Sequence, residues 1–398
     1  MVNMEAARAA AATAIDAAAK DLEAISLSIH GRPELNFEEH HAHATLTGFL
    51  QAKGFHVERG AYRMPTAFQA VAGSGGPRIV VLCEYDALPG IGHACGHNLI
   101  AISGLATGIA LKAALGEGNG TVVVLGSPAE EGGGGKIELI KHGAFEGIDA
   151  AMMLHPTPRD AAYMNVLAIE QAEIEYRGRN AHAAAAPWEG VNALDAMIHA
   201  FSAIGLMRQQ ILPTDRVHGV ITNGGVKPNI IPDRTNAAFY LRSRTRAELA
   251  RLRPKIYGCF EGAATATGCT VTISQPEGEQ PYSDMIHNDV MAGAYTEHFE
   301  ANGLSLPTKQ QVLSGPGGST DMGDVSYVVP SIHPCFAIPT EPGTGNHTPG
   351  FTAAAATAEA HAATFRAAKA LAFTALDLYL APGKLEAAKA EFAREVAG

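Results

Sequence analysis

Residues 78–98 have the sequence RIVVLCEYDALPGIGHACGHN. The run over 78–83 is short and apolar, which is typical of a β-strand buried on both faces of a sheet. The residues that follow carry two histidines, a further cysteine and two carboxylates, separated by glycines that let the backbone turn sharply. In open parallel sheets ligands sit beyond the carboxyl ends of the strands, so we expect this segment to line a site.

The segments that follow alternate between predicted helices and predicted strands. Helices are predicted over 98–115 and 135–142, and strands over 121–126 and 150–154. This alternation indicates a parallel α/β sheet. The polar clusters at 84–97, 127–135 and 155–158 each follow a predicted strand. They should therefore converge on one edge of the sheet.

The middle of the chain has a different character. Strands are predicted at 173–177, 217–222, 235–243 and 270–274, with helices over 192–209 and 247–266. This order indicates an inserted α+β module with an antiparallel sheet, which we place at 171–283. The flanking segments 1–170 and 284–398 then form one α/β domain, completed by a helix near 288–302, a strand near 332–338 and a long helix over 352–379.

Length, charge and composition restrict the class of protein. A chain of 398 residues suits two domains, and 47% hydrophobic content supplies packed cores. The balance of 29 Lys and Arg against 40 Asp and Glu, 29 − 40 = −11, disfavours nucleic acid and anionic membranes as partners. No apolar run approaches the ~20 residues of a membrane helix, the first 25 residues are too charged for a signal peptide, and five cysteines make no disulfide framework. We expect a cytoplasmic protein.

Cysteine and histidine in the stretch at 93–97 suggest metal binding. Thiolate and imidazole are zinc-type ligands, and Cys95-Gly96-His97 can present two of them to one cavity. The alternative is a glycine-rich connecting loop whose histidines cap the next helix. For the separate cluster of His40, His41 and His43 with Glu38 and Glu39, a solvated polar face is the favoured interpretation.

A second polar segment, 127–136, contains Glu130 and Glu131 before a run of glycines. Adjacent carboxylates can divide labour, one ligating a metal and its neighbour activating water. A phosphate cradle is disfavoured, because the P-loop spacing is absent and two glutamates would repel an anion. His155 and His347 would each more often be structural. Together with Cys95, His97 and Glu131, however, they supply enough ligands for a two-metal site.

These motifs resemble those of the aminoacylase/carboxypeptidase G metallopeptidase family, peptidase family M20. The resemblance lies in HGRPE at 30–34 with Glu38, DALP at 86–89, HACGH at 93–97, PAEE at 128–131, HP at 155–156 and HTP at 347–349. Within the family the hippurate-hydrolase type is the most similar. The runs at 84–98 and at 318–326 look most like its p-aminobenzoyl-glutamate hydrolase and β-alanyl-lysine dipeptidase branch. The resemblance covers nearly the whole chain.

The resemblance implies a zinc-peptidase-like, mostly parallel α/β catalytic domain that binds two divalent metals, with an inserted lid and dimerisation domain. Cys95 would bridge the metals, and His97, Glu131, His155 and His347 would complete their ligands. Glu130 would be the general base, and Asp86 would orient a ligand histidine. The thiolate favours zinc, while the carboxylate and imidazole ligands also suit manganese.

For the lid, the resemblance implies three further site residues. His182 would reach the scissile carbonyl, often across the interface of a homodimer formed through the lid. Asn229 and Arg242 would hold the carboxylate of the substrate, and the alternative for Arg242 is an ion pair at a strand edge. Asn98 is a departure, because many hippurate-hydrolase-type relatives have Asp there.

The expected function is metal-assisted hydrolysis of the amide bond in small N-acyl or aminoacyl amino acids by activated water. A binding protein of the same fold without activity is disfavoured, because all five ligand positions and Glu130 are present. A hydrolase of carbamoyl or amidine C–N bonds is the other alternative. The preferred acyl group and amino acid do not follow from the sequence, because the pocket walls cannot be placed.

Overall fold

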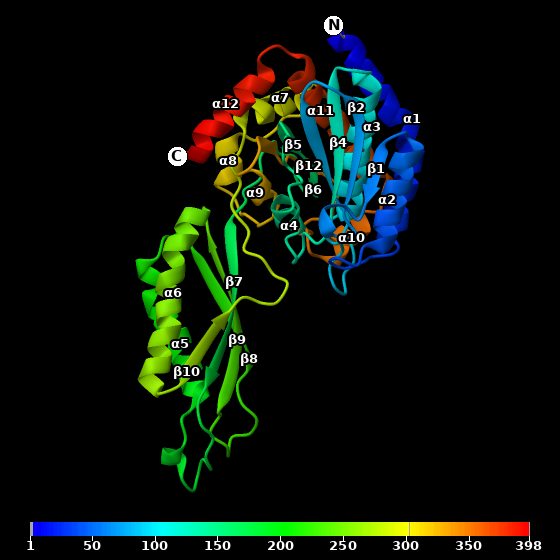
Figure 1. Cartoon of the computed structure of the whole chain (residues 1–398). Coiled ribbons are helices and arrows are strands. Elements are labelled where there is room, and N and C mark those ends of the chain that lie inside the picture. Colours follow the sequence, from blue (N-terminus) through cyan, green and yellow to red (C-terminus); the bar gives the residue numbers. More distant parts are fainter. Residues whose placement is uncertain (1–2, 302, 398) are drawn as a thin grey trace. The chain divides into compact units, whose positions relative to one another are not determined.

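The structure, a computed structural model, describes residues 3–301 and 303–397. It divides into two compact units (Figure 1). One unit contains the chain up to Asn165 and from Met285 onwards, and the other is Val166–Asp284. The module predicted at 171–283 lies within the second unit.

The first unit is built on a mixed sheet with the strand order β1-β2-β4-β3-β5-β11 among the described residues. The strands β3, β4, β5 and β11 are parallel, as predicted for the centre of the sheet. The hairpin of β1 and β2 was not predicted, and β2 adds an antiparallel strand beside β4. The strands are β1 (His56–Arg59), β2 (Phe68–Ser74), β3 (Arg78–Glu84), β4 (Gly120–Ser127), β5 (Ala150–Met152) and β11 (Ser331–Ile332).

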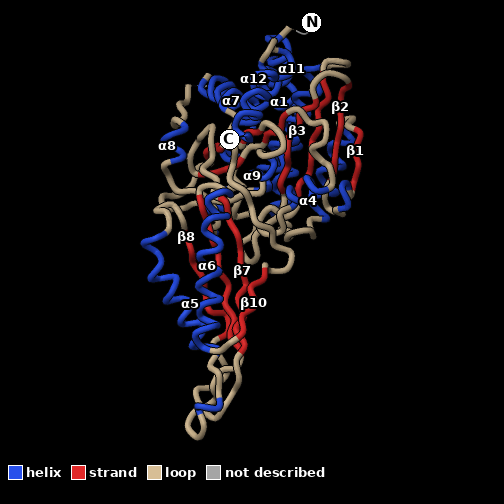
Figure 2. Tube along the Cα trace, turned by 60° about the vertical axis from the view of Figure 1, so that its left-hand side comes forward, coloured by secondary structure: helices blue, strands red, loops and turns tan. Residues whose placement is uncertain are grey.

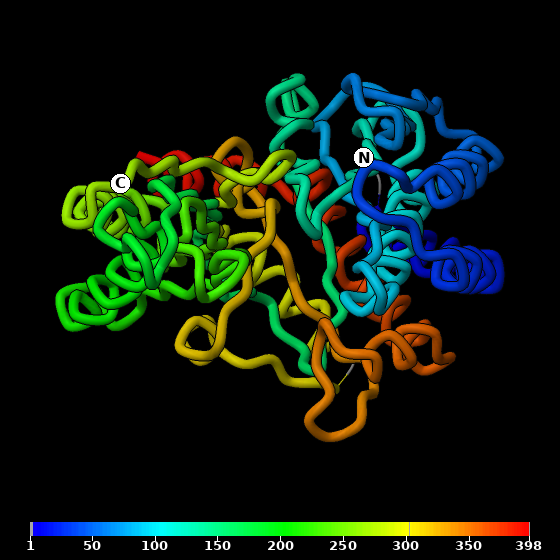
Figure 3. Tube along the Cα trace, turned by 90° about the horizontal axis from the view of Figure 1, so that it is seen from below, coloured from blue at the N-terminus to red at the C-terminus, as the bar shows by residue number. Residues whose placement is uncertain are grey.

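The helix α3 (His97–Leu115) is the core of this unit. It packs on β3 so closely that a Cβ at Gly104 would lie 2.4 Å from the Cys83 Sγ. The helices α1 (Met4–His30) and α11 (Ala358–Leu380) cover it, and α2 (His40–Ala52) lies beside α1 (Figures 1 and 3). By length and composition α3 could cross a membrane, contrary to the expectation that no apolar run is long enough, but 89% of its apolar window is buried in the protein.

The C-terminal part of the unit differs from the prediction at two points. The long helix expected over 352–379 is divided into α10 (Pro349–Ala354) and α11, because the Thr357 side chain caps α11 by accepting a hydrogen bond from the Ala360 N–H at 3.2 Å. The strand expected over 332–338 is divided at Pro334, which has no N–H to donate. Its second half, β12 (Cys335–Ala337), pairs with β6 (His155–Thr157) in a separate sheet.

The remaining helices of this unit are short or lie at its surface. They are α4 (Gly135–Lys141), α7 (Asp289–Glu300), α8 (Lys309–Leu313), α9 (Met322–Val325) and α12 (Lys384–Ala397). The predicted helix near 288–302 corresponds to α7, and its predicted last residue, 302, lies outside the described residues. Helix α12 packs against α7.

The second unit contains an antiparallel sheet with the order β10-β7-β9-β8 in the part of the chain that the structure describes. Burial alternates along β9, as expected when one face of a sheet is covered. Two helices, α5 (Ala193–Met207) and α6 (Arg246–Thr267), cover that face (Figure 2). The strands are β7 (Ala168–Arg177), β8 (Arg216–Asn223), β9 (Arg234–Ser243) and β10 (Thr270–Ser274). The prediction of an α+β module with an antiparallel sheet is confirmed.

Candidate metal centre

The polar segments after β3, β4 and β5 meet at the carboxyl edge of the parallel strands. Glu84 ends β3, Glu130 follows β4, and His155 follows β5. Cys95 and His97 are both directed to this edge by the turn at Gly96, which has a φ of +77°. A Cβ there would lie 2.6 Å from the Pro156 ring, so only glycine fits.

The structure brings all five predicted ligands together. Two groups of ligand atoms, each lying within 4.8 Å of one another, share Cys95. One group adds His97 and His155, and the other adds Glu131 and His347. A third group combines Glu84, His97 and Glu130. Two groups joined by one thiolate are the arrangement that a bridging ligand of two ions requires.

The spacing of these atoms suits a shared ion. The Cys95 Sγ lies 3.5 Å from the His155 Nε2, and the His347 Nε2 lies 3.4 Å from the Glu131 Oε1. Two ligands about 2.0–2.3 Å from one tetrahedral ion are about 3.3–3.8 Å apart. Both pairs have this separation. For His347 and Glu131 it is longer than most direct hydrogen bonds between nitrogen and oxygen.

Two buried ligand atoms have no hydrogen-bond partner among the described residues. They are the His97 Nε2 and the Glu131 Oε1. Leaving such an atom unsatisfied costs about 1–3 kcal/mol, so a native structure normally supplies a partner. Burial also raises the pKa of the Cys95 thiol, and a coordinated cation deprotonates such a thiol. The residues present therefore fit two divalent ions.

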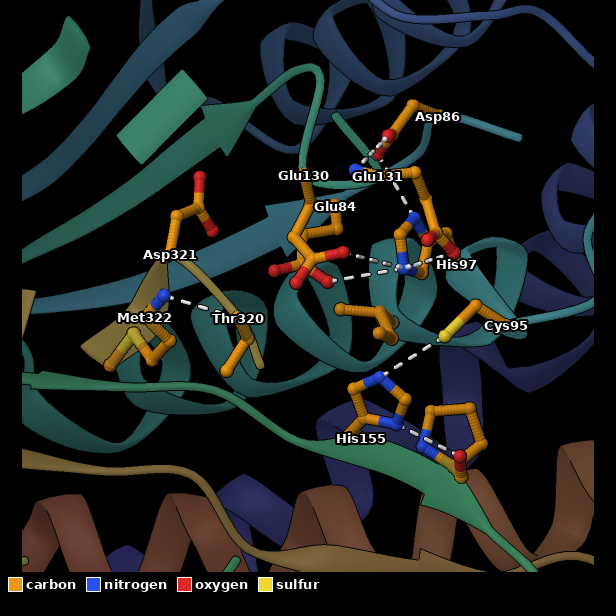
Figure 4. A network of polar contacts seen from close by, with 12 residues as sticks. Glu84, Asp86, Cys95, His97, Glu130, Glu131, His155, Thr320, Asp321 and Met322 are labelled. Atoms are coloured by element: carbon orange, nitrogen blue, oxygen red, sulfur yellow. Dashed lines mark hydrogen bonds and ion pairs between the residues drawn. The ribbon is translucent and has the colours of Figure 1, made fainter. Parts of the chain in front are cut away.

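Asp86 joins two of these ligands with one carboxylate. Its Oδ1 accepts a hydrogen bond from the His97 Nδ1 at 2.9 Å, and its Oδ2 accepts one from the Glu131 N–H at 2.9 Å. Burial alone would raise the pKa of Asp86, but the charge and hydrogen bond of His97 hold it below its usual value. With a metal bound, His97 would be neutral with its proton held on Nδ1 by Asp86, and its Nε2, which faces the ligand cluster (Figure 4), would present a lone pair to the ion.

Glu130, the predicted base, lies beside the ligands. Its Oε2 is 3.9 Å from the His97 Nε2, and burial, followed by the nearby charges of Glu84 and Glu131, raises its pKa well above the usual value. The preceding residue, Ala129, has a φ of +56°. A non-glycine residue in this region is strained and must be held by its surroundings.

Glu39 holds that backbone and corrects one prediction. We expected Glu39 to lie on a solvated face, but it is fully buried. Its Oε1 accepts hydrogen bonds from the N–H groups of Ala129 and Phe37, each at 2.9 Å. Burial and the charge of Asp86 raise the pKa of Glu39 to about 7. The neighbouring Glu38 has the same side chain but is exposed, so no local pattern distinguishes the buried glutamate from the exposed one.

Three charged residues beneath the centre, Glu84, Lys136 and Asp321, had no predicted role, although the segment that begins at Glu84 was expected at this edge. The Lys136 ammonium, fully buried, contacts the Glu84 Oε1 and donates to the Asp321 Oδ1 at 2.6 Å. The Lys136 backbone N–H donates to the Asp321 Oδ2 at 2.8 Å. In the sequence, the one local sign of this cluster is Lys136, a single lysine after the run of glycines that follows a buried strand.

In the second unit, two of the three predicted residues lie together. The Ala183 N–H donates to the Asn229 carbonyl at 3.0 Å, and His182 forms a β-bridge with Ile230. The His182 Nδ1 accepts a hydrogen bond from the Ala185 N–H at 3.1 Å. The proton of a neutral His182 ring is therefore on Nε2, where it can be donated to another group.

Arg242 is at the opposite end of the same sheet. In the pairing of β7 with β9, Arg234 faces Arg177 at one end, and Arg242 faces Ile169 at the other. His182 follows β7 beyond Arg177. Eight residues at ~3.4 Å each place Arg242 about 27 Å from Arg234. One chain therefore cannot present His182 and Arg242 of this unit to the same small molecule.

Asn98 lies away from the ligands. Its Nδ2 donates to the Ser26 Oγ at 2.8 Å and to the Ala355 carbonyl at 2.9 Å. These contacts join α3 to α1 and to the end of α10. The departure from Asp at this position therefore affects helix packing.

Comparisons with known proteins identify relatives of this chain. The sequence model of the M20 peptidase dimerisation domain matches residues 169–264. The chain is 47% identical to the Xaa-Arg dipeptidase of Mus musculus, over 96% of this chain and 91% of that protein. It is 30% identical to one of the subunits of the p-aminobenzoyl-glutamate hydrolase of Escherichia coli, over 95% of this chain and 93% of that subunit.

Solved structures share the fold at lower identity. A dinuclear metal-binding peptidase of the M20 family from Bacillus subtilis has a TM-score of 0.68 at 19% identity, covering 91% of this chain and 99% of that chain. An aminobenzoyl-glutamate utilization protein from Klebsiella pneumoniae also has a TM-score of 0.68, at 16% identity, covering 92% and 98%.

Proposed function

Because the chain belongs to the M20 peptidase family, in its hippurate-hydrolase-type branch, we propose that it is a dipeptidase for substrates with a basic C-terminal residue. It is a metal-dependent hydrolase of amide bonds in small aminoacyl or N-acyl amino acids. The preference for a basic residue is supported by the 47% identity with the mouse Xaa-Arg dipeptidase along 96% of this chain.

The two ions, when bound, supply a water of lowered pKa and polarise the scissile carbonyl. Cys95 would contact both ions, and zinc is the favoured metal because thiolate is a soft ligand, with manganese the alternative. Glu130 would take the proton of the attacking water and deliver it to the leaving amine. Its buried position next to other carboxylates favours the proton-accepting role.

His182 would donate its Nε2–H to the oxyanion that develops on the substrate carbonyl. Asn229 and Arg242 would hold the substrate carboxylate, and the guanidinium of Arg242 can bind both of its oxygens. The distance of about 27 Å along the sheet means that His182 and Arg242 can act on one substrate only if they come from two chains. Since Asn229 lies beside His182, it too would reach the substrate carboxylate from the other chain.

A homodimer through the second unit would supply that second chain. The strand β8 is at the edge of the sheet, with unpaired backbone groups on its outer side. Apolar side chains are exposed along it and along α5: Val220 at 63%, Ile221 at 43%, Ile198 at 52% and Leu206 at 82%. Pairing of two β8 edges would cover these side chains.

A substrate panel tests the proposed specificity. The metal-loaded protein is assayed with alanyl-arginine, β-alanyl-lysine, alanyl-leucine, an N-acetyl amino acid and an N-carbamoyl amino acid, and both free amino acid and ammonia are measured. We expect the highest kcat/KM for the two dipeptides with basic C-termini. A preference for alanyl-leucine would refute the basic specificity, and ammonia from the carbamoyl compound as the main product would identify the alternative reaction.

Mixing two inactive variants tests the shared site. Glu130→Gln and His182→Ala proteins are combined under conditions in which exchange of subunits is measured independently. If His182 acts on the partner's site, a mixed dimer regains one intact site and about half of the wild-type activity. Exchange without recovery would show that each chain uses its own His182 or that this residue has another role.

A further inference from the structure

Glu84 is a carboxylate at the metal centre whose two oxygens have different surroundings. The side chain is fully buried. Its Oε1 contacts the Lys136 ammonium. Its Oε2 has no hydrogen-bond partner within the described ranges and lies 3.5 Å from the His97 Nε2. One oxygen is therefore fixed, and the other faces the ligand cluster.

The contact between Glu84 and His97 needs a positive charge. Burial lowers the pKa of His97, but the charge and hydrogen bond of Asp86, together with the charge of Glu84, raise it well above its usual value, so in the metal-free protein a proton on Nε2 supplies that charge. A metal ion bound by both side chains would take the place of that proton, with the Nε2 lone pair and the Glu84 Oε2 directed at it. The separation equals that of the Cys95 Sγ and the His155 Nε2, also 3.5 Å, and is the one that two ligands of a tetrahedral ion show.

We propose that Glu84 is a further ligand, through Oε2, of the ion that His97 holds, and that Lys136 is the residue that positions it. This inference rests on the proposed dinuclear centre. Figure 4 shows Glu84 and Glu130 facing His97 from the same side. His97 is the member that the group of Glu84 and Glu130 has in common with the group of Cys95 and His155, so it is through the ion on His97 that the carboxylate would join the centre.

Lys136 fixes the direction of the Glu84 carboxylate. The ammonium cannot itself bind a metal, since it has no lone pair. It occupies the Glu84 Oε1 and so leaves only Oε2 for the ion. Asp321 holds Lys136 at two points, the ammonium at 2.6 Å and the backbone N–H at 2.8 Å. A buried ion pair of this kind adds little to stability, so a positioning role accounts better for its presence.

Metal affinity tests the proposal without reference to activity. The wild-type protein and the Glu84→Gln variant are titrated with Zn²⁺ against a chromophoric chelator, and bound metal is counted by mass spectrometry. We expect the wild type to bind two ions and the variant to bind one of them at least tenfold more weakly. Asp377→Asn is the matched control, since Asp377 is a buried, ion-paired carboxylate whose partners are Arg8 and His298.

A second variant covers the case in which Glu84→Gln does not fold. Glu84→Asp keeps the charge beside Lys136 but withdraws the oxygens by about one bond length, so it should also weaken one ion at least tenfold. Lys136→Met should weaken the same ion, and the double variant with Glu84→Gln should be no weaker than either single one, because the two residues act as one unit.

The outcomes separate this proposal from the proposed function. Wild-type protein that bound no ion would overturn the dinuclear centre and this inference with it. Wild-type protein with two ions, together with folded Glu84 variants of unchanged affinity, would overturn the role of Glu84 alone. Additive effects of Lys136→Met and Glu84→Gln would overturn the positioning role of Lys136.

Discussion

The substitution Asp86→Asn tests how the ligands are oriented. Asp86 is buried and accepts hydrogen bonds from the His97 Nδ1 and from the Glu131 backbone N–H, each at 2.9 Å. An asparagine has a similar shape but offers one carbonyl oxygen and one NH₂ group. It can accept from only one of the two donors, and its NH₂ group then faces the other donor.

The size of the effect follows from that unmet donor. A buried donor without a partner costs about 1–3 kcal/mol, and about 1.4 kcal/mol is a factor of ten in an equilibrium constant. If this cost falls on the ligand that the lost hydrogen bond oriented, metal affinity drops by about 10–100-fold. We therefore expect the Kd of at least one ion to rise by that factor.

Competition with a chromophoric chelator measures this Kd, and circular dichroism establishes that the variant is folded. Asp377→Asn serves as the control, because it removes a buried carboxylate whose partners are Arg8 and His298. A folded Asp86→Asn protein with wild-type affinity for both ions would refute the orienting role.

Three other changes have defined outcomes. Glu130→Gln should keep both ions yet lose about 10²-fold or more in kcat, whereas Glu131→Gln should lose metal, so equal metal loss would contradict the division of roles. Cys95→Ala should abolish turnover and lower bound metal, while Cys259→Ala should do neither. The pKa of the Glu39 carboxyl is about 7 in the folded protein, whereas its ordinary value, taken for the unfolded chain, is 4.5. The metal-free protein should therefore lose up to about 3 kcal/mol of its free energy of unfolding as the pH rises from 4.5 to 7. Glu39→Gln should flatten this slope in denaturant titrations; an unchanged slope would contradict the assignment.

The central strands and the ligand-bearing loops could be predicted because their signals are local. An apolar run followed by glycines and ligand residues identifies β3 and the segment that ends at His97. The parallel arrangement then predicts that segments far apart in the chain meet at one edge, and the five ligands do lie there. The break at Thr357 was missed because the alanine-rich pattern continues across it and only the cap interrupts the helix.

Contacts between distant segments explain why other features of the site could not be predicted from the sequence. Glu39 is buried because it holds the backbone of Ala129, which lies 90 residues away. The Lys136 ammonium meets Asp321 across 185 residues, so neither residue carries a local sign of the pairing. The distance between His182 and Arg242 also depends on the register of β7 with β9, which periodicity alone does not determine.

We propose that Cys95 joins two metal ions in one hydrolytic centre. Anomalous diffraction from crystals of the zinc-loaded protein, collected at the metal absorption edge, tests it most directly. We expect two anomalous peaks about 3.5–4 Å apart, both in contact with the Cys95 Sγ. A single peak, or two peaks of which only one contacts Cys95, would contradict it.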